Sequence, residues 1–427
     1  MTFKQVLARF SSASAVFCKP GTERVEALCA ALGAPQNAFP VIHVTGTNGK
    51  GSTSRMIAEV LREAGYQTGQ FSSPYLCSPT ESVRIGGAPI DKRRFSAAAA
   101  AVFTAADTLT DPPTEFELLT VIALEAFRRA KVEIAVIEVG MGGRTDATNV
   151  ISTPLLSVIT GVSREHTAYL GDTVKEIAGE KAGIIKEGCP VLLGKMDKEA
   201  RAVISARARS LHAPLYESDF TKFSLLRATP AGSTFTYRAY KDIPLSLLGL
   251  YQTKNAALAL DALSLLRPRL PRVEEDSIRR ALAALHWEGR FECLSSDPPV
   301  YFDGGHNPEG VAAAEESIRT YFKEGVILVS GILKDKDSRA VTRILAPHAR
   351  AVFTVTPPSN RALRAEEYAH AFAEAGIPAQ PCESVEQAFA LALAEAKKRA
   401  LPLLCIGSLY LYSDVGKALK RLAVRSR

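Results

Sequence analysis

Short apolar runs alternate with longer segments of helical periodicity along almost the whole chain. Residues 39–46 (FPVIHVTG), 132–140 (VEIAVIEVG) and 153–162 (TPLLSVITGV) are apolar runs with the length and β-branched content of buried parallel strands. Residues 51–65 and 116–130 instead place their apolar side chains at helical spacing. Because strand and helix patterns alternate, the sequence predicts an α/β protein with a mostly parallel sheet.

A second series of strand and helix patterns begins after residues 294–299 (LSSDPP), where turn-forming residues interrupt the periodicity. Its apolar runs are residues 300–305, 325–333, 349–356 and 401–411. The pattern predicts two domains, residues 1–295 and residues 296–427, the second a smaller Rossmann-like α/β domain. The GxGxxG dinucleotide fingerprint does not occur in this second part.

The composition agrees with a two-domain globular protein. The chain has 427 residues, of which 47% are hydrophobic and 23% charged. No apolar run approaches the roughly 18 residues of a membrane helix. The stretch before Cys18 is too short, and too interrupted by serines and Arg9, for a lipoprotein signal. The seven cysteines are scattered without a CxxC pair, which favours reduced thiols and a cytoplasmic location over disulfides or a zinc site.

The net charge of +7 is compatible with nucleic acid, but equally with anionic small molecules. Basic residues are spread along the chain except in residues 417–427, where cations suit the end of a terminal helix. Aromatic and basic residues are not interleaved as in nucleic-acid platforms. Neither a nucleic-acid partner nor a membrane partner is therefore expected.

Residues 41–53 (VIHVTGTNGKGST) have the order strand, glycine-rich turn, helix, which is the context of a phosphate-binding loop. Backbone N–H groups and the helix dipole can hold a triphosphate, Lys50 can reach its outer phosphates, and a nearby hydroxyl can bind Mg²⁺. The match to GxxxxGK followed by Ser or Thr is imperfect. Val44 stands at the first glycine, and Gly51 separates the lysine from Ser52. A glycine-rich β–α turn without a nucleotide is the alternative. The NKxD motif of GTPases is absent.

Polar residues at the ends of three other strands are candidate ligands. Glu138 ends a buried strand, where open α/β sheets bind their ligands; it can hold a metal or accept N–H groups from the glycine turn that follows. His166 follows another strand and can be a ligand or a structural histidine. Asp303 and His306 flank a glycine turn, and can bind ribose or a metal or simply form the turn.

These segments occur together in a known family. Residues 19–53 resemble the opening of the folylpolyglutamate synthase and dihydrofolate synthase family, within the Mur ligase superfamily. The resemblance recurs in order over nearly the whole chain, at SSPYL, TEFELLT, EVGMGGRTDATN, EHTAYLG, AGEKAGIIK, LLGLYQTKNAALAL, WEGRFE, FDGGHNP and IGSLYL. It implies a phosphate-loop ATPase domain followed by a C-terminal ligase domain. The loop of this family reads GTNGKGS, which accounts for both departures from the general motif.

The resemblance also implies site residues. It assigns to ATP the residues Gly49, Lys50, Gly51, Ser52, Thr53, Asn255, Arg290 and Asp303. It assigns two Mg²⁺ ions to Ser52, Ser73, Glu138 and His166. Lys181 matches a lysine that the family carries as a carbamate, an anion that can help hold Mg²⁺; a phosphate-pairing lysine is the alternative. Catalytic roles would fall to Lys50, Lys181 and His306.

The acceptor side of the implied site is less regular. The resemblance places the pteridine-bearing substrate against Thr114, Glu115, Phe116 and Glu117, and against Thr145, Asp146 and Ala147. The family usually has SPHL followed closely by NERI, whereas residues 73–85 read SPYLCSPTESVRI, with tyrosine for histidine and a longer spacer. This departure leaves the acceptor contacts of the loop open. Two milder changes are EH for the usual DH and DGGHNP for DGAHNP.

The implied activity is ATP-dependent amide formation. ATP phosphorylates a substrate carboxylate, the amino group of L-glutamate attacks the acyl phosphate, and phosphate leaves. Closure of the second domain onto the first, with Arg290 and Asp303 between them, would exclude water from the acyl phosphate. The expected partners are ATP, L-glutamate and dihydropteroate or folate, and the expected state is a monomer.

Three other functions are compatible with the sequence. A Mur ligase proper joins an amino acid to a UDP-muramyl precursor, but it usually carries a UDP-binding domain before the loop, and only 45 residues precede Gly46. A phosphate-loop kinase would consume ATP without glutamate. A nucleotide-gated binding protein would show no multiple-turnover ADP release. The sequence does not decide whether dihydropteroate, tetrahydrofolate or both are acceptors.

Overall fold

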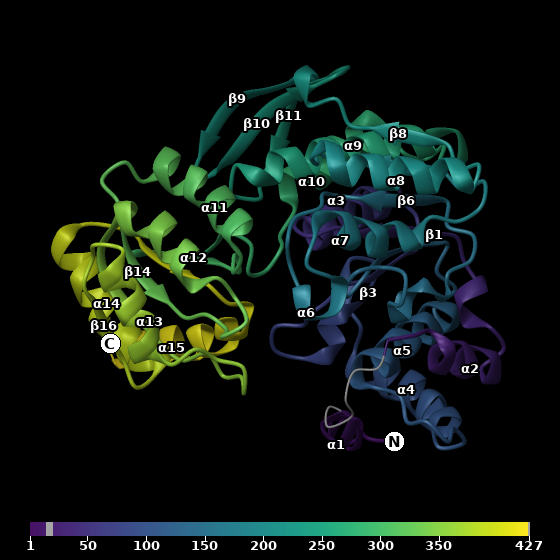
Figure 1. Cartoon of the computed structure of the whole chain (residues 1–427), viewed down its shortest axis with the longest axis horizontal. Coiled ribbons are helices and arrows are strands. Elements are labelled where there is room, and N and C mark those ends of the chain that lie inside the picture. Colours follow the sequence, from purple (N-terminus) through teal and green to yellow (C-terminus); the bar gives the residue numbers. More distant parts are fainter. Residues whose placement is uncertain (14–19, 426–427) are drawn as a thin grey trace. The chain divides into compact units, whose positions relative to one another are not determined.

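The computed structural model describes residues 1–13 and 20–425, and Cys18 lies outside the described residues. The chain forms two compact units, which Figure 1 shows coloured along the sequence. The first unit is Met1–Lys222 with Asn255–Leu282, and the second is Phe223–Lys254 with Ala283–Arg427. The compact units divide the chain at residues 222/223, 254/255 and 282/283. The predicted domain boundary between residues 295 and 296 stays a prediction.

An eight-stranded sheet forms the centre of the first unit, in the order β4-β3-β2-β5-β1-β6-β7-β8. The strands are β1 (Val41–Thr45), β2 (Thr68–Phe71), β3 (Val83–Ile85), β4 (Ala88–Pro89), β5 (Ile134–Glu138), β6 (Leu156–Ile159), β7 (Val191–Leu193) and β8 (Leu215–Glu217). The six neighbouring strands β2-β5-β1-β6-β7-β8 pair in parallel. Strand β3 pairs antiparallel with β2 on one side and with β4 on the other. Every residue of β1, β5 and β6 is buried, as their continuous apolar runs predict.

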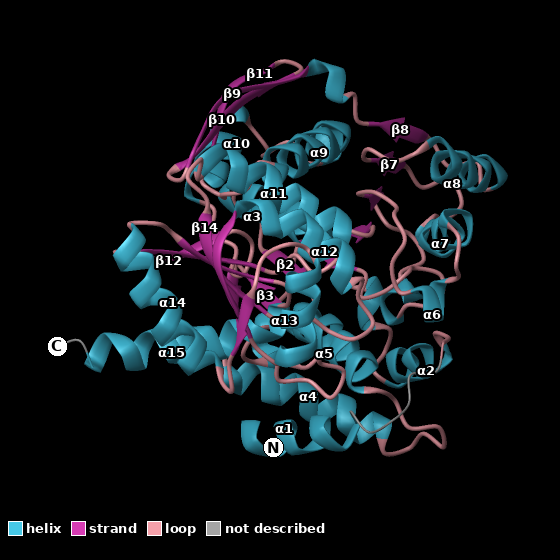
Figure 2. Cartoon of the chain, turned by 60° about the vertical axis from the view of Figure 1, so that its left-hand side comes forward, coloured by secondary structure: helices cyan, strands magenta, loops and turns pink. Residues whose placement is uncertain are grey.

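Ten helices belong wholly or mainly to the first unit among the described residues, and Figure 2 distinguishes helices from strands by colour. They are α1 (Phe3–Ala13), α2 (Glu23–Ala31), α3 (Lys50–Glu63), α4 (Lys92–Ala106), α5 (Glu115–Arg129), α6 (Thr167–Leu170), α7 (Val174–Lys181), α8 (Lys198–Ser210), α9 (Tyr251–Leu266) and α10 (Glu275–Ala284). The predicted helices at 51–65 and 116–130 correspond to α3 and α5. A Thr114–Glu117 capping box begins α5, and Arg128 and Arg129 lie in its last turn, where they suit the helix dipole.

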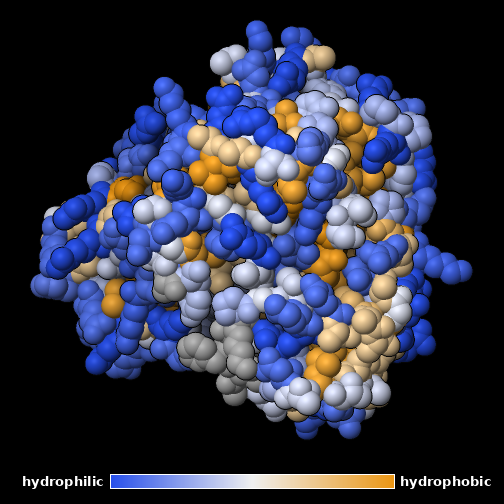
Figure 3. Space-filling model, turned by 45° about the vertical axis from the view of Figure 1, so that its right-hand side comes forward, coloured by the Kyte–Doolittle hydropathy of each residue, from blue (hydrophilic) through white to orange (hydrophobic). Residues whose placement is uncertain are grey.

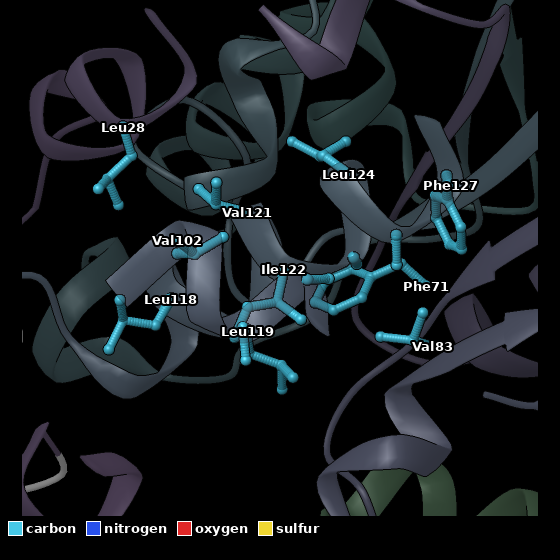
Figure 4. Packing of buried hydrophobic residues seen from close by; sticks show 14 of the residues in the cluster. Leu28, Phe71, Val83, Val102, Leu118, Leu119, Val121, Ile122, Leu124 and Phe127 are labelled. Atoms are coloured by element: carbon cyan, nitrogen blue, oxygen red, sulfur yellow. The ribbon is translucent and has the colours of Figure 1, made fainter. Parts of the chain in front are cut away.

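The two faces of this sheet are covered by different helices. Val41, Phe71 and Ile137 point into a buried cluster that also contains side chains of α1, α2, α4 and α5. Figure 4 shows part of this packing, with Phe71 beside residues of α5. Neighbouring strand residues point to opposite faces, and α3 lies against β1, β2 and β5. The phosphate-loop candidate between β1 and α3 is therefore held by a fully packed framework.

The second unit contains two sheets. The larger has the order β12-β13-β17-β14-β15-β16 and is parallel except for β12, and the smaller has the antiparallel order β11-β10-β9. The strands are β9 (Phe223–Thr229), β10 (Gly232–Tyr237), β11 (Tyr240–Leu245), β12 (Glu292–Ser296), β13 (Pro299–Asp303), β14 (Val326–Ser330), β15 (Ala349–Thr354), β16 (Ala379–Pro381) and β17 (Leu403–Ile406). The four predicted strands correspond to β13, β14, β15 and β17, which confirms the second α/β unit.

The small antiparallel sheet was not predicted from the sequence. It belongs to the second unit because β9 lies against α11, and because the Leu250 N–H that follows the sheet donates to the Ser317 hydroxyl at 2.8 Å. The helices of this unit are α11 (Pro308–Tyr321), α12 (Ser338–Leu345), α13 (Ala365–Glu374), α14 (Val385–Arg399) and α15 (Tyr412–Arg425). The basic end of the chain is thus largely helical, as predicted.

Short 3-10 turns complete the described elements: η1 (Pro35–Asn37), η2 (Pro79–Ser82), η3 (Ala147–Val150), η4 (Ala182–Ile184), η5 (Phe220–Lys222), η6 (Arg267–Arg269), η7 (Ala346–His348) and η8 (Leu409–Leu411). On the face shown in Figure 3, hydrophilic residues dominate, with smaller hydrophobic patches between them. Within residues 1–13 and 20–425, no helix combines the length and apolarity needed to cross a bilayer. The six described cysteines are free thiols.

Candidate active site

The glycine-rich loop between β1 and α3 is shaped by close contacts that exclude larger side chains. Gly46 has φ +148°, and a Cβ placed on it would lie 1.9 Å from Thr160 Oγ1. Gly49 has φ +83°, and a Cβ there would lie 2.6 Å from Asn255 Oδ1. The Thr160 hydroxyl also donates to the Asn48 carbonyl at 2.6 Å. Glycine at 46 and 49 is therefore required by space and by backbone conformation together.

The first turn of α3 presents polar side chains behind this loop. Lys50 Nζ donates to the carbonyls of Gly46 at 2.9 Å and Thr47 at 3.1 Å, so its ammonium lies over the loop. Ser52 and Thr53 are 2% and 0% exposed. A threonine inside a helix commonly bonds a carbonyl of the preceding turn, but Thr53 Oγ1 is buried without a hydrogen-bond partner in the described protein. The loop thus combines a cation with an unsatisfied buried hydroxyl.

Glu138 lies beside this loop at the same edge of the sheet. It ends β5, and its register partner in β1 is Val44, two residues before Gly46. The Glu138 side chain is 3% exposed, and its Oε2 accepts the Ser73 N–H at 3.4 Å. Glu138 thus lies at the end of the strand next to the phosphate loop and contacts the backbone of Ser73, while a metal site formed by the two side chains stays a prediction.

Lys181 is almost fully buried at the end of α7 and pairs with Glu165. Its Nζ donates to Glu165 Oε1 at 3.0 Å, and the two side chains are 1% and 6% exposed. Burial lowers the pKa of Lys181 to about 8, although the Glu165 carboxylate opposes this shift. Burial would raise the pKa of Glu165, but the charges of Lys50, Lys181 and His166 together hold it at about 2. An anion–cation cluster thus links α7 to the phosphate loop.

The four residues Thr114–Glu117, predicted to bind the acceptor, begin α5 and make different contacts. Glu117 is buried, caps α5 through the Thr114 N–H at 2.7 Å, and receives Arg24 Nη2 at 2.8 Å and Arg24 Nε at 3.0 Å. Glu117 is therefore part of a buried ion pair with Arg24 and of the cap of α5, and its contact with the substrate stays a prediction. Phe116 packs against Gly140, where an added Cβ would lie 2.4 Å from the ring. Glu115 accepts the Tyr75 hydroxyl at 2.8 Å.

Asp146 is connected through Thr148 to His43 in β1, the strand that precedes the phosphate loop. It accepts the Thr148 N–H at 2.9 Å, the Thr148 hydroxyl at 2.6 Å and the Met141 N–H at 2.9 Å, while burial raises its pKa. His43 Nε2 in β1 lies 2.9 Å from the Thr148 hydroxyl. Because that hydroxyl donates to Asp146, His43 Nε2 is the donor of this second bond. Of the other two predicted acceptor residues, Thr145 is exposed and Ala147 is buried.

His43 makes the stability of the protein sensitive to acid. Burial, with a smaller effect of the Lys186 charge, lowers its pKa from 6.5 to about 3. The unfolded chain therefore binds a proton between these values and the folded chain does not, so stability falls as the pH drops from 6.5 towards 3. We expect His43→Gln to remove about 1 kcal/mol per pH unit from this slope, measured by urea unfolding at stepped pH. An unchanged slope in His43→Gln would contradict the assignment.

The second unit contributes its own polar cluster at the end of β13. Asp303 is 2% exposed and accepts the Tyr251 hydroxyl at 2.6 Å, the Phe291 N–H at 2.9 Å and the Gly305 N–H at 2.7 Å. Burial raises its pKa, an effect that these donors oppose. Arg290 lies against the same turn, since a Cβ on Gly304 would be 2.6 Å from its Nη1. His306 Nδ1 is 2.9 Å from the Gly304 carbonyl.

The residues predicted to bind ATP and Mg²⁺ or to act in catalysis are divided between the two units. The loop residues, Ser73, Glu138, Lys181 and Asn255 lie in the first unit, and Arg290, Asp303 and His306 in the second. Thr160, which contacts Gly46, and Tyr251, which donates to Asp303, are among the partners that were not predicted from the sequence. Thr160 lies in the predicted strand at 153–162, and Tyr251 lies in the family motif LLGLYQTKNAALAL. A single hydroxyl at the end of a strand or the start of a helix does not indicate which distant residue it will contact.

A cavity of about 520 Å³ at the opposite end of β1 belongs to neither group. It is lined by residues between 36 and 41 and between 151 and 155, none of them charged. A site without charged side chains does not suit a triphosphate or a dicarboxylate. The polar groups at the carboxyl edge of the sheet remain the candidate site.

Comparison with known proteins identifies the class that this fold and site define. Residues 44–263 match the Mur ligase middle domain, and residues 289–409 match the glutamate ligase domain of Mur ligases. The dihydrofolate synthase/folylpolyglutamate synthase of Bacillus subtilis is 36% identical over 94% of this chain and 95% of its own.

Two solved structures have the same fold over almost the whole chain. Mycobacterium tuberculosis folylpolyglutamate synthase complexed with ADP has a TM-score of 0.89 and 31% identity, over 98% of each chain. The Escherichia coli protein FolC in complex with DHPP and ADP has a TM-score of 0.86 and 29% identity, over 100% of this chain and 99% of that one. The chain therefore belongs to the dihydrofolate synthase/folylpolyglutamate synthase family of the Mur ligase superfamily, as the sequence motifs predict, and is an ATP-dependent ligase.

Proposed function

We propose that the protein joins the amino group of L-glutamate to the carboxylate of a pteridine-bearing acceptor, dihydropteroate, tetrahydrofolate polyglutamate or both. The observation that carries this proposal is the glycine loop with Lys50, set beside Glu138 at the carboxyl edge of one sheet. The names and the bound ADP and DHPP of the relatives support the same substrates. The scattered free cysteines favour a cytoplasmic protein, and we propose a monomer.

ATP would occupy the loop of the first unit. The backbone from Gly49 to Thr53 would bind the phosphates at the start of α3, where the helix dipole favours anions. The Lys50 ammonium would leave the loop carbonyls that it now contacts and pair with the outer phosphates. Asn255 would contact the adenine. Arg290 and Asp303 of the second unit would also contact ATP.

The residues present fit Mg²⁺. Mg²⁺ prefers oxygen donors and takes one or two carboxylates together with substrate phosphates and water. Ser52, Ser73 and Glu138 offer such oxygens, and His166 would be an additional ligand. Among the described residues no three acidic, histidine or cysteine side chains cluster into a closed protein site, which agrees with ions held largely by phosphate. When bound, Mg²⁺ would offset the charge of the transferring phosphoryl group.

The chemistry requires two bond exchanges. An acceptor carboxylate oxygen bonds to the γ-phosphorus of ATP and ADP leaves; the glutamate nitrogen then bonds to the carbonyl carbon and phosphate leaves with that oxygen. The amine loses a proton as the amide forms. The Lys50 ammonium would stabilise the negative charge on the γ-phosphoryl group while it moves from ADP to the acceptor carboxylate. His306, which lies in the same glycine turn as Asp303, would be a catalytic residue close to the phosphates.

We also propose that Lys181 is carbamylated, because its amine is buried and its neutral form is the one that attacks CO₂. A carbamate beside Glu165 would place two anions together, so a cation must join them, which ties the modification to Mg²⁺. We expect protein equilibrated with ¹³C-bicarbonate and Mg²⁺ to show one carbamate carbon resonance by NMR, absent in Lys181→Gln. If wild type and Lys181→Gln give the same spectrum, Lys181 is an unmodified lysine.

Glutamate-dependent ADP release tests the function itself. Purified protein with ATP, Mg²⁺ and L-glutamate should release ADP in multiple turnovers when dihydropteroate, tetrahydrofolate or both are added. Turnover with both acceptors defines a bifunctional enzyme, and turnover with one decides between the two activities. ADP release that does not depend on glutamate would favour a kinase and contradict the proposal.

A further inference from the structure

The loop in which this chain departs from its family is firmly held in place. The carboxylate of Glu81 accepts three successive backbone N–H groups, from Leu76 at 2.9 Å, Cys77 at 3.1 Å and Ser78 at 3.0 Å. Ser78 and Glu81 also form a capping box around η2. The longer spacer is therefore closed into a compact turn rather than left as an open insertion.

Tyr75, the residue that replaces the usual histidine, connects this loop to α5. Its ring is half-buried and packs against the apolar core beneath the sheet. Its hydroxyl donates to Glu115 Oε1 at 2.8 Å, in the first turn of α5. A charge-assisted hydrogen bond of this kind is stronger than a neutral one and directional.

This bond closes a ring of contacts around the carboxyl end of β5. Two residues before Tyr75, the Ser73 N–H reaches Glu138 at 3.4 Å. One residue after Glu115, the ring of Phe116 packs against Gly140, two residues beyond Glu138. The loop, α5 and the end of β5 are thus joined at three points, and the Tyr75–Glu115 bond is the one made by a residue in which this chain differs from the family pattern.

We infer that Tyr75 is a positioning residue for the acceptor: by holding Glu115, it keeps the loop of residues 73–85 against α5 in the arrangement that receives the pteridine-bearing substrate. The inference rests on the proposed function, because it assigns the loop to the acceptor rather than to ATP. Tyr75 acts through Glu115 and does not touch the reacting atoms. Its loss should therefore weaken acceptor binding while leaving phosphoryl transfer intact.

The test is Tyr75→Phe, which keeps the packed ring and removes only the hydroxyl. We expect KM for the acceptor to rise about tenfold, as for the loss of one hydrogen bond to a charged group. The kcat and the KM for ATP should stay within about twofold. The exposed Tyr216→Phe is the matched control and should change none of these values. An unchanged acceptor KM, or an equal change in all three values, would overturn the inference.

A double-mutant cycle tests whether Tyr75 acts through Glu115. Adding Tyr75→Phe to Glu115→Leu should change the acceptor KM by less than about twofold; a full additional tenfold loss would refute the link. Amide exchange gives a readout that needs no activity: residues 76–78 should exchange faster in Tyr75→Phe. If wild type shows no turnover with either acceptor, the proposed function fails, and unchanged exchange in Tyr75→Phe separately refutes the positioning role.

Discussion

Lys50→Ala is expected to lower kcat by at least about a hundredfold while leaving the fold intact. One preorganised charge on a reacting group is commonly worth a factor of about 10² to 10³, and Lys50 is the cation whose ammonium lies over the loop, 2.9 Å from the Gly46 carbonyl. Its hydrogen bonds in this structure are to loop carbonyls, and the buried Glu165 carboxylate, which Lys50 also stabilises, keeps Lys181 as its ion-pair partner in the variant. The measurement is glutamate-dependent ADP release together with urea unfolding.

Lys198→Ala is the matched control, because Lys198 is also the first residue of a helix in the same unit and is exposed. It should retain wild-type turnover and stability. Near-normal activity in Lys50→Ala would mean that the loop does not carry the phosphates. A large loss of unfolding free energy in Lys50→Ala would mean that the lysine is structural.

Glu117→Leu is expected to lower the free energy of unfolding by about 3 to 5 kcal/mol, because it leaves the Arg24 guanidinium buried without its bidentate partner. The Arg24 and Glu117 side chains are only 9% and 6% exposed. Glu117 also caps α5, so the loss combines an ion pair with a helix cap. Urea unfolding of the purified variant measures this effect.

Asp111→Asn is the control for this second prediction. Asp111 pairs with the same arginine at 2.9 Å, but its side chain is 46% exposed, so its removal should cost less than about 1 kcal/mol. The outcome also decides the role of Glu117. A Glu117→Leu protein of wild-type stability with a raised acceptor KM would instead support the expectation from the family that Glu117 contacts the substrate.

The sequence predicted well those features that depend on local pattern. Continuous apolar runs identified β1, β5 and β6 because interior parallel strands are buried on both faces. The glycine loop was also readable, because strand, turn and helix follow one another directly. The acidic Glu138 was placed correctly at the edge of the sheet, because parallel strands end at a common edge.

Features that depend on distant partners were not predictable from the same pattern. Glu117 reads like its neighbour Glu115, yet only the fold brings Arg24, 93 positions away in the chain, against Glu117. The small sheet of β9, β10 and β11 was missed because β9 and β11 are mostly exposed or half-buried, so their sequences form neither a continuous apolar run nor a regular alternation. Tyr75 was recognised as a departure from the family, but its bond to Glu115 depends on how the loop folds.

Transfer of ¹⁸O from the acceptor carboxylate is the most direct test of the central claim that this chain forms amides through an acyl phosphate. The acceptor is labelled with ¹⁸O in its reacting carboxylate, incubated with ATP, Mg²⁺ and L-glutamate, and the released phosphate is examined by mass spectrometry. We expect one ¹⁸O atom in each phosphate, because the carboxylate oxygen leaves with phosphorus. Unlabelled phosphate accompanying an amide product would contradict it.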